Sequence, residues 1–212
     1  MRAAWTDGGS RSFDPIPAIV LCGGEGSRLG GDVEKPLVEV DGVPMIDRVL
    51  DALQEADRVD RIHAVTSPKA PETKVHLREN RETGKDGLVV HAGAGGGYVA
   101  DLNDALERTG TPAVAVAADL PLLSGEDVDR AVERATGESL SVCVPLALKQ
   151  AVGVSADTTF DHNGTTVAPT GLNVVGTDAD RVHVVDSEAL AVNVNHPRDL
   201  AVARTLAARD QD

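Results

Sequence analysis

Residues 21–36 read LCGGEGSRLGGDVEKP, and this stretch decides how the chain folds and what it binds. It follows a short apolar run, residues 15–20, which predicts a buried first strand. Four glycines between positions 23 and 30 allow sharp turns and leave backbone N–H groups uncovered. Such groups bind anions as a nest, and Arg28 and Lys35 add a bidentate cation and a point charge. The stretch therefore predicts a loop that binds a nucleoside triphosphate and supports attack on its α-phosphate.

Two common phosphate-binding motifs do not match this loop. A dinucleotide-binding fingerprint requires G-x-G-x-x-G, and Leu29 stands where the third glycine would be. A P-loop requires G-x-x-x-x-G-K-[ST], and the sequence contains no Gly-Lys-Ser or Gly-Lys-Thr. The pattern that remains is G-G-x-G-x-R-L-G followed by E-K-P. The alternative interpretation is a glycine-rich loop that binds nothing.

Short apolar segments alternate with amphipathic segments along the chain. We expect strands at residues 15–20, 37–40, 62–65, 88–90, 113–118, 140–145, 172–175, 182–185 and 190–194. We expect helices at residues 44–53, 72–81, 99–107, 126–135 and 196–208. This alternation predicts an α/β fold in which a mostly parallel central sheet carries helices on both faces.

The length of 212 residues suits one domain. We expect residues 1–13 to be a disordered leader, because they are polar and lack the apolar core of a signal peptide. Residues 14–212 are then a single domain. Within it, residues 147–170 include a polar, Thr/Asp-rich stretch and are predicted to form an excursion that binds the acceptor substrate.

The composition argues against several classes of protein. No apolar stretch reaches the roughly 18 residues that a membrane span needs. The net charge is −14 and the Lys/Arg residues form no cluster, so the basic face typical of nucleic-acid binding is missing. Cys22 and Cys143 lie in apolar, strand-like segments and are predicted to be buried thiols, which suits a reducing cytoplasm.

The acidic bias has two interpretations. Lysines number five against fifteen arginines, and the acidic residues fall mainly on predicted helix faces and loops. An ordinary solvated acidic surface would account for this pattern. Adaptation to high intracellular salt, which screens repulsion between like charges, would account for it too, and we favour this second interpretation.

Asp119 directly follows the strand expected at residues 113–118. Ligands of open α/β sheets bind outside the carboxyl ends of the strands, so Asp119 is expected at the same edge as the glycine loop. A carboxylate at that edge can hold Mg²⁺ between the triphosphate oxygens. The alternative is an aspartate that only caps a loop.

Three further segments are candidates for the nucleotide site. Gly97, Tyr98 and Asp101 follow small residues that let a flat base approach the backbone, and Tyr98 can stack on it or donate a hydrogen bond. The alternative for this segment is a loop followed by an N-capped helix. Gly171 lies at the start of a strand, where a structural bulge is the alternative. Asn193 can complete a metal or ribose site, whereas Asn195 is expected to cap the last helix.

Taken together, these motifs resemble the archaeal adenosylcobinamide-phosphate guanylyltransferases, members of the nucleotidyltransferase superfamily, over residues 16–200. The glycine loop alone specifies only the superfamily, which includes molybdenum-cofactor guanylyltransferases and sugar-1-phosphate nucleotidyltransferases. The narrower resemblance depends on G-Y-x-x-D-L-N at residues 97–103 and G-L-N-V-V at residues 171–175. It implies a Rossmann-like three-layer sandwich and transfer of GMP from GTP to adenosylcobinamide phosphate, with release of pyrophosphate.

The resemblance also implies residue roles. Arg28 and Lys35 would be catalytic, holding the β/γ-phosphates and the α-phosphate, and Asp119 would hold Mg²⁺. The implied nucleotide-binding residues are Leu21, Cys22, Gly23, Gly24, Gly26, Ser27, Ser67, Gly97, Tyr98, Asp101, Gly171 and Asn193. The partners implied are GTP and a corrinoid phosphate, in a cytoplasmic protein that can form a homodimer. A nucleotide sensor without activity is a remaining alternative, which the presence of Arg28, Lys35 and Asp119 disfavours.

Overall fold

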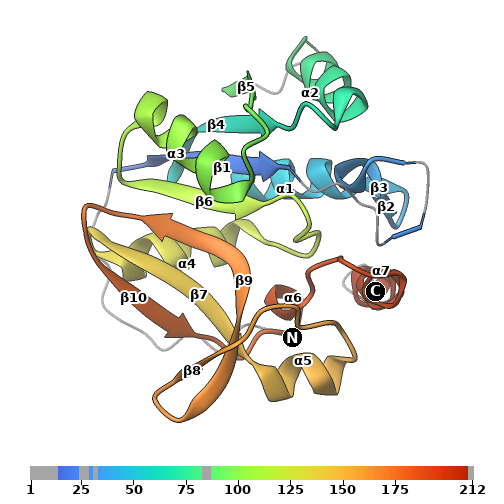
Figure 1. The fold of residues 1–212 in the computed structure, drawn as a ribbon, viewed down its shortest axis with the longest axis vertical. Coiled ribbons are helices and arrows are strands. Elements are labelled where there is room, and N and C mark those ends of the chain that lie inside the picture. The colour runs from blue at the N-terminus through green and yellow to red at the C-terminus, as the bar shows by residue number, and fades with distance from the viewer. Residues whose placement is uncertain (1–13, 24–28, 31–32, 83–86, 210–212) are drawn as a thin grey trace.

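The structure is a computed structural model that describes residues 14–23, 29–30, 33–82 and 87–209 (Figure 1). The expected leader, residues 1–13, lies outside the described residues. The strands are β1 (Ile16–Cys22), β2 (Glu39–Val40), β3 (Val43–Pro44), β4 (Val59–Thr66), β5 (Leu88–Ala92), β6 (Ala113–Ala117), β7 (Glu138–Pro145), β8 (Phe160–His162), β9 (Thr165–Val175) and β10 (Asp178–Val184). The helices are the 3₁₀ turn η1 (Lys35–Leu37), α1 (Met45–Glu55), α2 (Pro71–Glu82), α3 (Tyr98–Thr109), α4 (Gly125–Ala135), α5 (Leu146–Val152), α6 (Glu188–Ala191) and α7 (Pro197–Arg209).

The main sheet has eight strands in the order β10-β7-β9-β6-β1-β4-β5, with β8 paired to β9 outside this path. β1 lies parallel to both β4 and β6, β4 is parallel to β5, and β7 is parallel to β10. Only β9 runs antiparallel to its neighbours β6, β7 and β8. The predicted α/β fold with a mostly parallel sheet is therefore confirmed.

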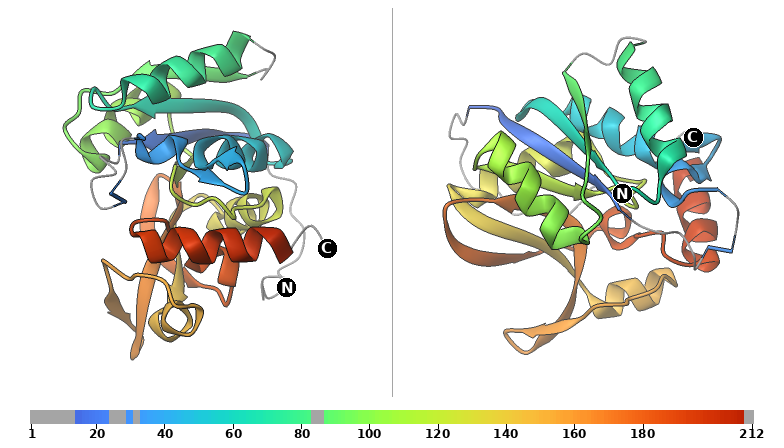
Figure 2. Two further views of the ribbon diagram at one scale, coloured as in Figure 1. Left: turned by 90° about the vertical axis from the view of Figure 1, so that its right-hand side faces the viewer. Right: turned by 45° about the horizontal axis from the view of Figure 1, so that its top comes forward.

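Helices cover both faces of this sheet, because successive side chains of each strand point to opposite sides. On one face, Ala18 and Val20 of β1 pack in a core that includes apolar residues of α1, α2 and α4. On the other face, Ile19 and Leu21 pack against α3. Figures 1 and 2 show the resulting three layers, which are the sandwich that the sequence resemblance implies.

The segment between β1 and α1 differs in part from expectation. A strand was predicted at residues 37–40, but residues 35–37 form η1 with Pro36 buried, and only Glu39–Val40 pairs with β3. Asp41 and Gly42 form the turn between β2 and β3. Both residues have positive φ, 54° and 73°, as in the tight turn of a two-residue hairpin.

The strand predicted at residues 190–194 is wrong. Ser187 begins a short helix there, α6, and its side chain accepts a hydrogen bond from Leu190 N. Beyond α6 the chain does not join the sheet. Instead Val194 N donates to Asp119 O across 3.0 Å, so this segment passes beside the loop that follows β6.

The predicted excursion at residues 147–170 contains most of α5, all of β8 and the first part of β9. The helix α5 was not predicted from the sequence. In Figure 1 these elements lie together at one end of the molecule, away from β5 and α2.

No helix among the described residues is long and apolar enough to cross a membrane.

Candidate active site

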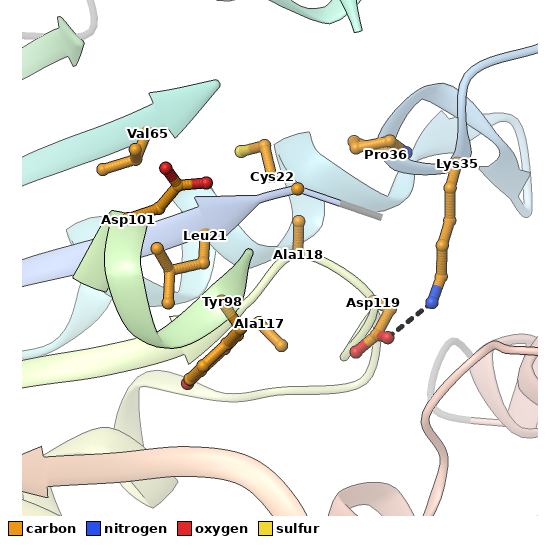
Figure 3. Close-up of a pocket in the computed structure, with 11 residues that line it drawn as sticks. Leu21, Cys22, Lys35, Pro36, Val65, Tyr98, Asp101, Ala117, Ala118 and Asp119 are labelled. Carbon is orange, nitrogen blue, oxygen red and sulfur yellow. Dashed lines mark hydrogen bonds and ion pairs between the residues drawn. The ribbon is translucent and has the colours of Figure 1, made fainter. Parts of the chain in front are cut away.

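A pocket of about 210 Å³ opens at the carboxyl ends of β1, β4 and β6 (Figure 3). The described residues that line it are Leu21, Cys22, Gly23, Lys35, Pro36, Val65, Tyr98, Asp101, Ala117, Ala118 and Asp119. After β1 the chain builds β4 and β5 on one side and then returns to place β6 on the other. The pocket therefore lies at the point where the strand order reverses, which is the usual ligand site of an open α/β sheet.

The pocket brings together many of the residues that the sequence singled out. Seven of the predicted site residues line it: Leu21, Cys22, Gly23, Lys35, Tyr98, Asp101 and Asp119. Gly171 adjoins it, since a Cβ there would come within 3.1 Å of Ala117 Cβ. Ser67 and Gly97 are not among its described lining residues. The predicted Gly24, Gly26, Ser27 and Arg28 lie outside the described residues.

The apolar lining residues Pro36, Val65, Ala117 and Ala118 were not predicted as site residues. The last three stand at or next to the ends of expected strands, so the rule that placed Asp119 at this edge would also have indicated them. Cys22 is fully buried, as predicted, and burial raises the pKa of its thiol to about 12. Cys22 therefore stays protonated at neutral pH and provides bulk rather than a nucleophile.

Lys35 and Asp119 are in direct contact at one end of the pocket although 84 positions separate them in the chain (Figure 3). Lys35 Nζ donates to Asp119 Oδ2 over 2.6 Å and to Asn195 Oδ1 over 2.7 Å. The two charged side chains are only 12% and 18% exposed, so water screens their attraction less than it would on the open surface. Asn195 was expected to cap α7, but its side chain instead holds this lysine.

Glu34 fixes the segment that carries Lys35. Its Oε1 accepts from Glu72 N over 2.9 Å, and its Oε2 accepts from Thr73 N and Thr73 Oγ1 over 2.7 and 2.6 Å. These donors lie in the first turn of α2, where backbone N–H groups lack helical partners and favour a negative charge. The Glu-Lys-Pro motif therefore anchors one residue to α2, directs the next into the pocket and buries the third.

The other end of the pocket is formed by the start of α3. Asp101 is 5% exposed, and its Oδ1 accepts a hydrogen bond from Gly95 N over 3.2 Å. A Cβ at Gly93 would lie 2.9 Å from the same Oδ1, so only glycine fits against this carboxylate. Tyr98 is partly exposed, yet desolvation raises the pKa of its phenol, as does Asp119, while a hydrogen bond with Asn173 opposes the shift.

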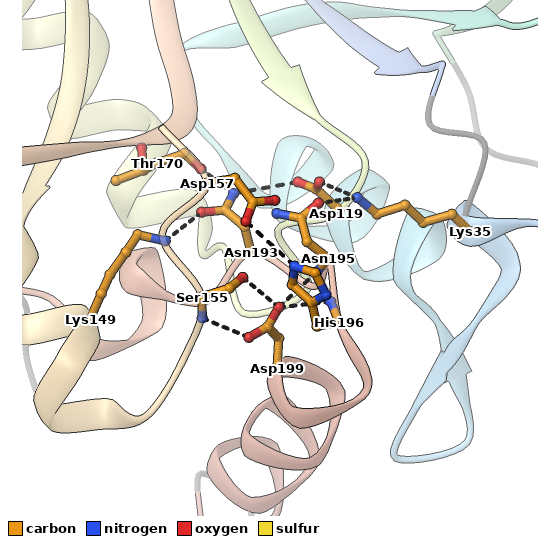
Figure 4. Close-up of polar contacts among 10 residues, drawn as sticks. All are labelled: Lys35, Asp119, Lys149, Ser155, Asp157, Thr170, Asn193, Asn195, His196 and Asp199. Atoms are coloured by element: carbon orange, nitrogen blue, oxygen red, sulfur yellow. Dashed lines mark hydrogen bonds and ion pairs between the residues drawn. The ribbon is translucent and has the colours of Figure 1, made fainter. Parts of the chain in front are cut away.

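A second group of polar contacts lies behind Asp119 (Figure 4). Asp199 of α7 is fully buried, and its carboxylate accepts from Ser155 N and Ser155 Oγ, each over 2.7 Å. It also accepts from the backbone N–H groups of Asn195 and His196, over 3.0 and 2.8 Å. Asp199 thus caps the start of α7, ties it to the predicted excursion, and orients the residue whose side chain holds Lys35.

These contacts predict how stability depends on pH. Burial by itself raises the pKa of Asp199, but hydrogen bonds from Ser155, His196 and Asn195 outweigh it, so the net shift is downward. A lowered folded-state pKa stabilises the fold above the unfolded value of about 4, and this stabilisation is lost as the pH falls through the folded value. Urea midpoints measured from pH 7 to pH 3 should fall towards acid, and Asp199→Asn should remove part of that dependence.

The matched control for this prediction is Asp104→Asn, because Asp104 is exposed on α3. Its urea midpoints should follow those of the unchanged protein at every pH. A profile for Asp199→Asn that keeps the full dependence would contradict the assignment of this buried carboxylate.

The pocket combines Gly23 of the glycine loop, Lys35, and Asp119 at the end of β6. This combination defines the site of an enzyme that transfers nucleotidyl groups. The chain belongs to the family of MobA-like NTP transferase domains, which matches residues 18–209. It is 31% identical over 207 residues to the adenosylcobinamide-phosphate guanylyltransferase of Methanocaldococcus jannaschii, a match that covers 92% of this chain and 99% of that relative. It is a nucleotidyltransferase.

Two other comparisons are less extensive or more distant. The chain is 34% identical over 128 residues to a probable molybdenum cofactor guanylyltransferase of Thermococcus kodakarensis, covering 59% of this chain and 57% of that relative. The solved 4-diphosphocytidyl-2C-methyl-D-erythritol synthase of Anaerococcus prevotii superimposes with a TM-score of 0.66 at 11% identity, over 92% of this chain and 97% of that one. This second likeness shows the fold.

Proposed function

We propose that this chain transfers GMP from GTP to adenosylcobinamide phosphate, which gives adenosylcobinamide-GDP and pyrophosphate. The observation that carries the proposal is the match to the Methanocaldococcus jannaschii guanylyltransferase over nearly the whole of both chains. The pocket supports it, because a cation and a carboxylate meet where the triphosphate of a bound nucleotide would lie. The place of the reaction in metabolism would be the assembly of the nucleotide loop of cobamides.

In the proposed reaction an oxygen of the acceptor phosphate attacks the α-phosphorus of GTP. A bond forms between that oxygen and the α-phosphorus, the bond to the bridging β-phosphate oxygen breaks, and pyrophosphate leaves. The nucleophile is already an anion, so no strong general base is needed. The work of the protein is to position the reactants and to stabilise the charge that develops, as in other phosphoryl transfers.

We propose residue roles that combine the resemblance with the chemistry of the pocket. Lys35 would bind the α-phosphate as its charge grows, and the backbone from Gly23 onward would bind the triphosphate. Arg28 and the glycines that precede it would hold the β- and γ-phosphates. Asp101 and Tyr98 lie at the other end of the pocket, where the nucleoside would bind.

We propose Mg²⁺ as the metal, held by Asp119. Mg²⁺ in such sites needs one or two protein carboxylates, because the substrate phosphates and water supply its other ligands. Asp119 provides one carboxylate, and the described residues contain no group of three or more His, Cys, Asp or Glu side chains that could bind a metal by themselves. This donor set fits a metal that arrives with the triphosphate. The ion would neutralise charge on the phosphates and assist the departure of pyrophosphate.

For the acceptor, we propose that the excursion at residues 147–170 contacts the corrinoid. It carries an exposed aromatic side chain, Phe160, which is 38% exposed on β8. A large flat acceptor would pack its apolar face on an exposed side chain of this kind. We also propose a cytoplasmic protein that binds no nucleic acid and can form a homodimer. Both cysteines are free and buried, which suits a reducing compartment.

One experiment separates the candidate functions. Pyrophosphate release is measured with GTP and Mg²⁺ in the presence of adenosylcobinamide phosphate, molybdopterin or mannose 1-phosphate, each against a reaction without acceptor. Release that requires adenosylcobinamide phosphate supports the proposal. Release with molybdopterin would favour a molybdenum cofactor guanylyltransferase, an alternative that the match to the Thermococcus kodakarensis protein supports. Release with none of the three would contradict the proposed reaction.

We propose that the protein is adapted to high intracellular salt, because its net charge is −14 and its lysine content is low. This proposal predicts that stability depends on salt. We expect the melting temperature to rise as KCl is raised from about 0.01 M to 1 M, since the Debye length then falls from about 30 Å to about 3 Å and repulsion between surface carboxylates is screened. Sodium sulfate serves as a control for general salt effects on burial. A melting temperature that stays flat or falls with KCl would indicate an ordinary acidic surface instead.

A further inference from the structure

Lys149 is a buried cation outside the residues so far assigned a role. It lies on α5, and the residue is only 3% exposed. Its Nζ donates to Ala191 O at the end of α6 over 2.8 Å and to Asn193 Oδ1 over 3.0 Å (Figure 4). It is not among the described residues that line the pocket.

A buried ammonium group is costly unless its donors are satisfied and a negative charge is near. Burial lowers the pKa of Lys149, while Asp199, Asp119 and Asp157 oppose that shift. If α5 only needed to be attached to the fold, an apolar side chain would do so at less cost, as Leu148 of the same helix does by packing on the core. The contacts of the ammonium group therefore point to a role beyond packing.

The ammonium group fixes which way the Asn193 side chain faces. Lys149 has only donors, so the atom of Asn193 that meets it must be the oxygen. The amide nitrogen then points the other way, 2.6 Å from Thr170 O and 3.4 Å from Asp119 Oδ1. Gly171 leaves room for this arrangement, because a Cβ there would lie 3.3 Å from Asn193 Nδ2.

Asp119 is consequently held at both carboxylate oxygens. Oδ2 accepts from Lys35, and Oδ1 faces the Asn193 amide nitrogen. Should Lys35 turn towards a phosphate when nucleotide binds, the Asn193 contact is the one that remains on the carboxylate among the described residues. Its orientation then depends on Lys149.

We propose that Lys149 is a positioning residue for the transfer reaction: it holds the Asn193 amide so that Asn193 orients the Asp119 carboxylate. This inference deepens the proposed function and rests on it. It gives Asn193 a role through its N–H group rather than as an oxygen ligand of the metal, because its oxygen is engaged by Lys149. Partners that orient a ligand in this way typically change metal affinity or activity about 10- to 100-fold when removed.

The test is a double-mutant cycle of Lys149→Met and Asn193→Ala, read out by pyrophosphate release. Lys149→Met should lower kcat about tenfold and leave the KM for GTP within about threefold, as expected for the loss of an orienting partner. In the Asn193→Ala background, Lys149→Met should add less than about a twofold effect, because the two residues act as one unit. An undiminished tenfold effect in that background would overturn the proposal, since Lys149 would then act by another route.

A matched control uses Arg204, which also joins two segments through a carbonyl, Glu39 O, but lies away from the pocket. Arg204→Met should lower the melting temperature and leave kcat unchanged. If Lys149→Met does not fold, Lys149→Gln replaces it in the cycle, since it removes the ammonium group and keeps a polar side chain on α5. A Gln variant whose effect on kcat is undiminished in the Asn193→Ala background would contradict the proposal in the same way.

A second readout does not depend on turnover. The side-chain amide signals of Asn193, identified by NMR from their loss in Asn193→Ala, should be sharp and protected from exchange without nucleotide. In Lys149→Met they should shift and exchange faster, and unchanged signals would overturn the inference. If the unaltered enzyme releases no pyrophosphate with the corrinoid acceptor, the proposed function fails while this measurement still decides the role of Lys149.

Discussion

Lys35→Ala should lower the turnover of the enzyme by about 10²–10³, the usual loss when one oriented group that stabilises transition-state charge is removed. The structure gives the reason. Lys35 is held at the pocket by Asp119 and Asn195 over 2.6 and 2.7 Å, within reach of the place that the proposed reaction gives to the α-phosphate. Because that charge grows in the transition state, kcat should fall more than the affinity for GTP.

Two variants separate this effect from loss of structure. Lys35→Met keeps most of the length of the side chain without its charge, and its turnover should be as low as that of Lys35→Ala. Asn195→Ala keeps the charge and removes one of the acceptors that hold it, so its loss of turnover should be smaller. Steady-state kinetics in which Lys35→Ala turns over normally would remove Lys35 from the mechanism.

Gly23→Asp should abolish measurable GTP binding in a protein that still folds. Gly23 is the first glycine of the glycine loop, and it lines the pocket. A Cβ there would find its nearest neighbour, Asp101 Oδ2, at 3.9 Å, which is an ordinary contact. A carboxylate on that Cβ would oppose a phosphate about 4 Å away by about 4 kcal/mol near a protein surface, or about a thousandfold in affinity.

Gly23→Asn is the matched control, since it adds the same volume without the charge. It should bind GTP more weakly than the unaltered protein but far better than Gly23→Asp. Calorimetry gives both affinities, and circular dichroism checks that each variant is folded. Near-normal GTP affinity in a folded Gly23→Asp protein would contradict the placement of the triphosphate at this end of the pocket.

Much of the fold could be predicted because its strands are short apolar runs separated by amphipathic helices. The run at residues 113–118 illustrates this, since β6 is buried between β1 and β9. Residues 190–194 misled the prediction for the same reason. Val192 and Val194 are fully buried, but they pack against α7 and the β2–β3 region rather than within the sheet. Burial alone does not say whether a segment pairs with a strand.

The candidate site could be predicted where a residue follows a strand, and less well where a contact spans the chain. Asp119 and Lys35 were placed at one sheet edge by topology, and the structure puts them in direct contact. The parts played by Glu34, Asn195 and Lys149 could not be read from spacing. Each of them contacts a residue that is distant in the sequence: Glu34 binds the start of α2, Asn195 binds Lys35, and Lys149 binds Asn193. Local pattern contains no signal for such pairs.

Strand β9 runs from the excursion into the central sheet. Its N-terminal end pairs with β8 in the excursion, and its C-terminal half pairs with β6 beside Ala117. The outer hairpin can therefore lengthen, shorten or change its side chains without altering the residues that pair with β6. If the excursion contacts the acceptor as proposed, this arrangement would let the choice of acceptor change while the residues around the nucleotide pocket stay the same.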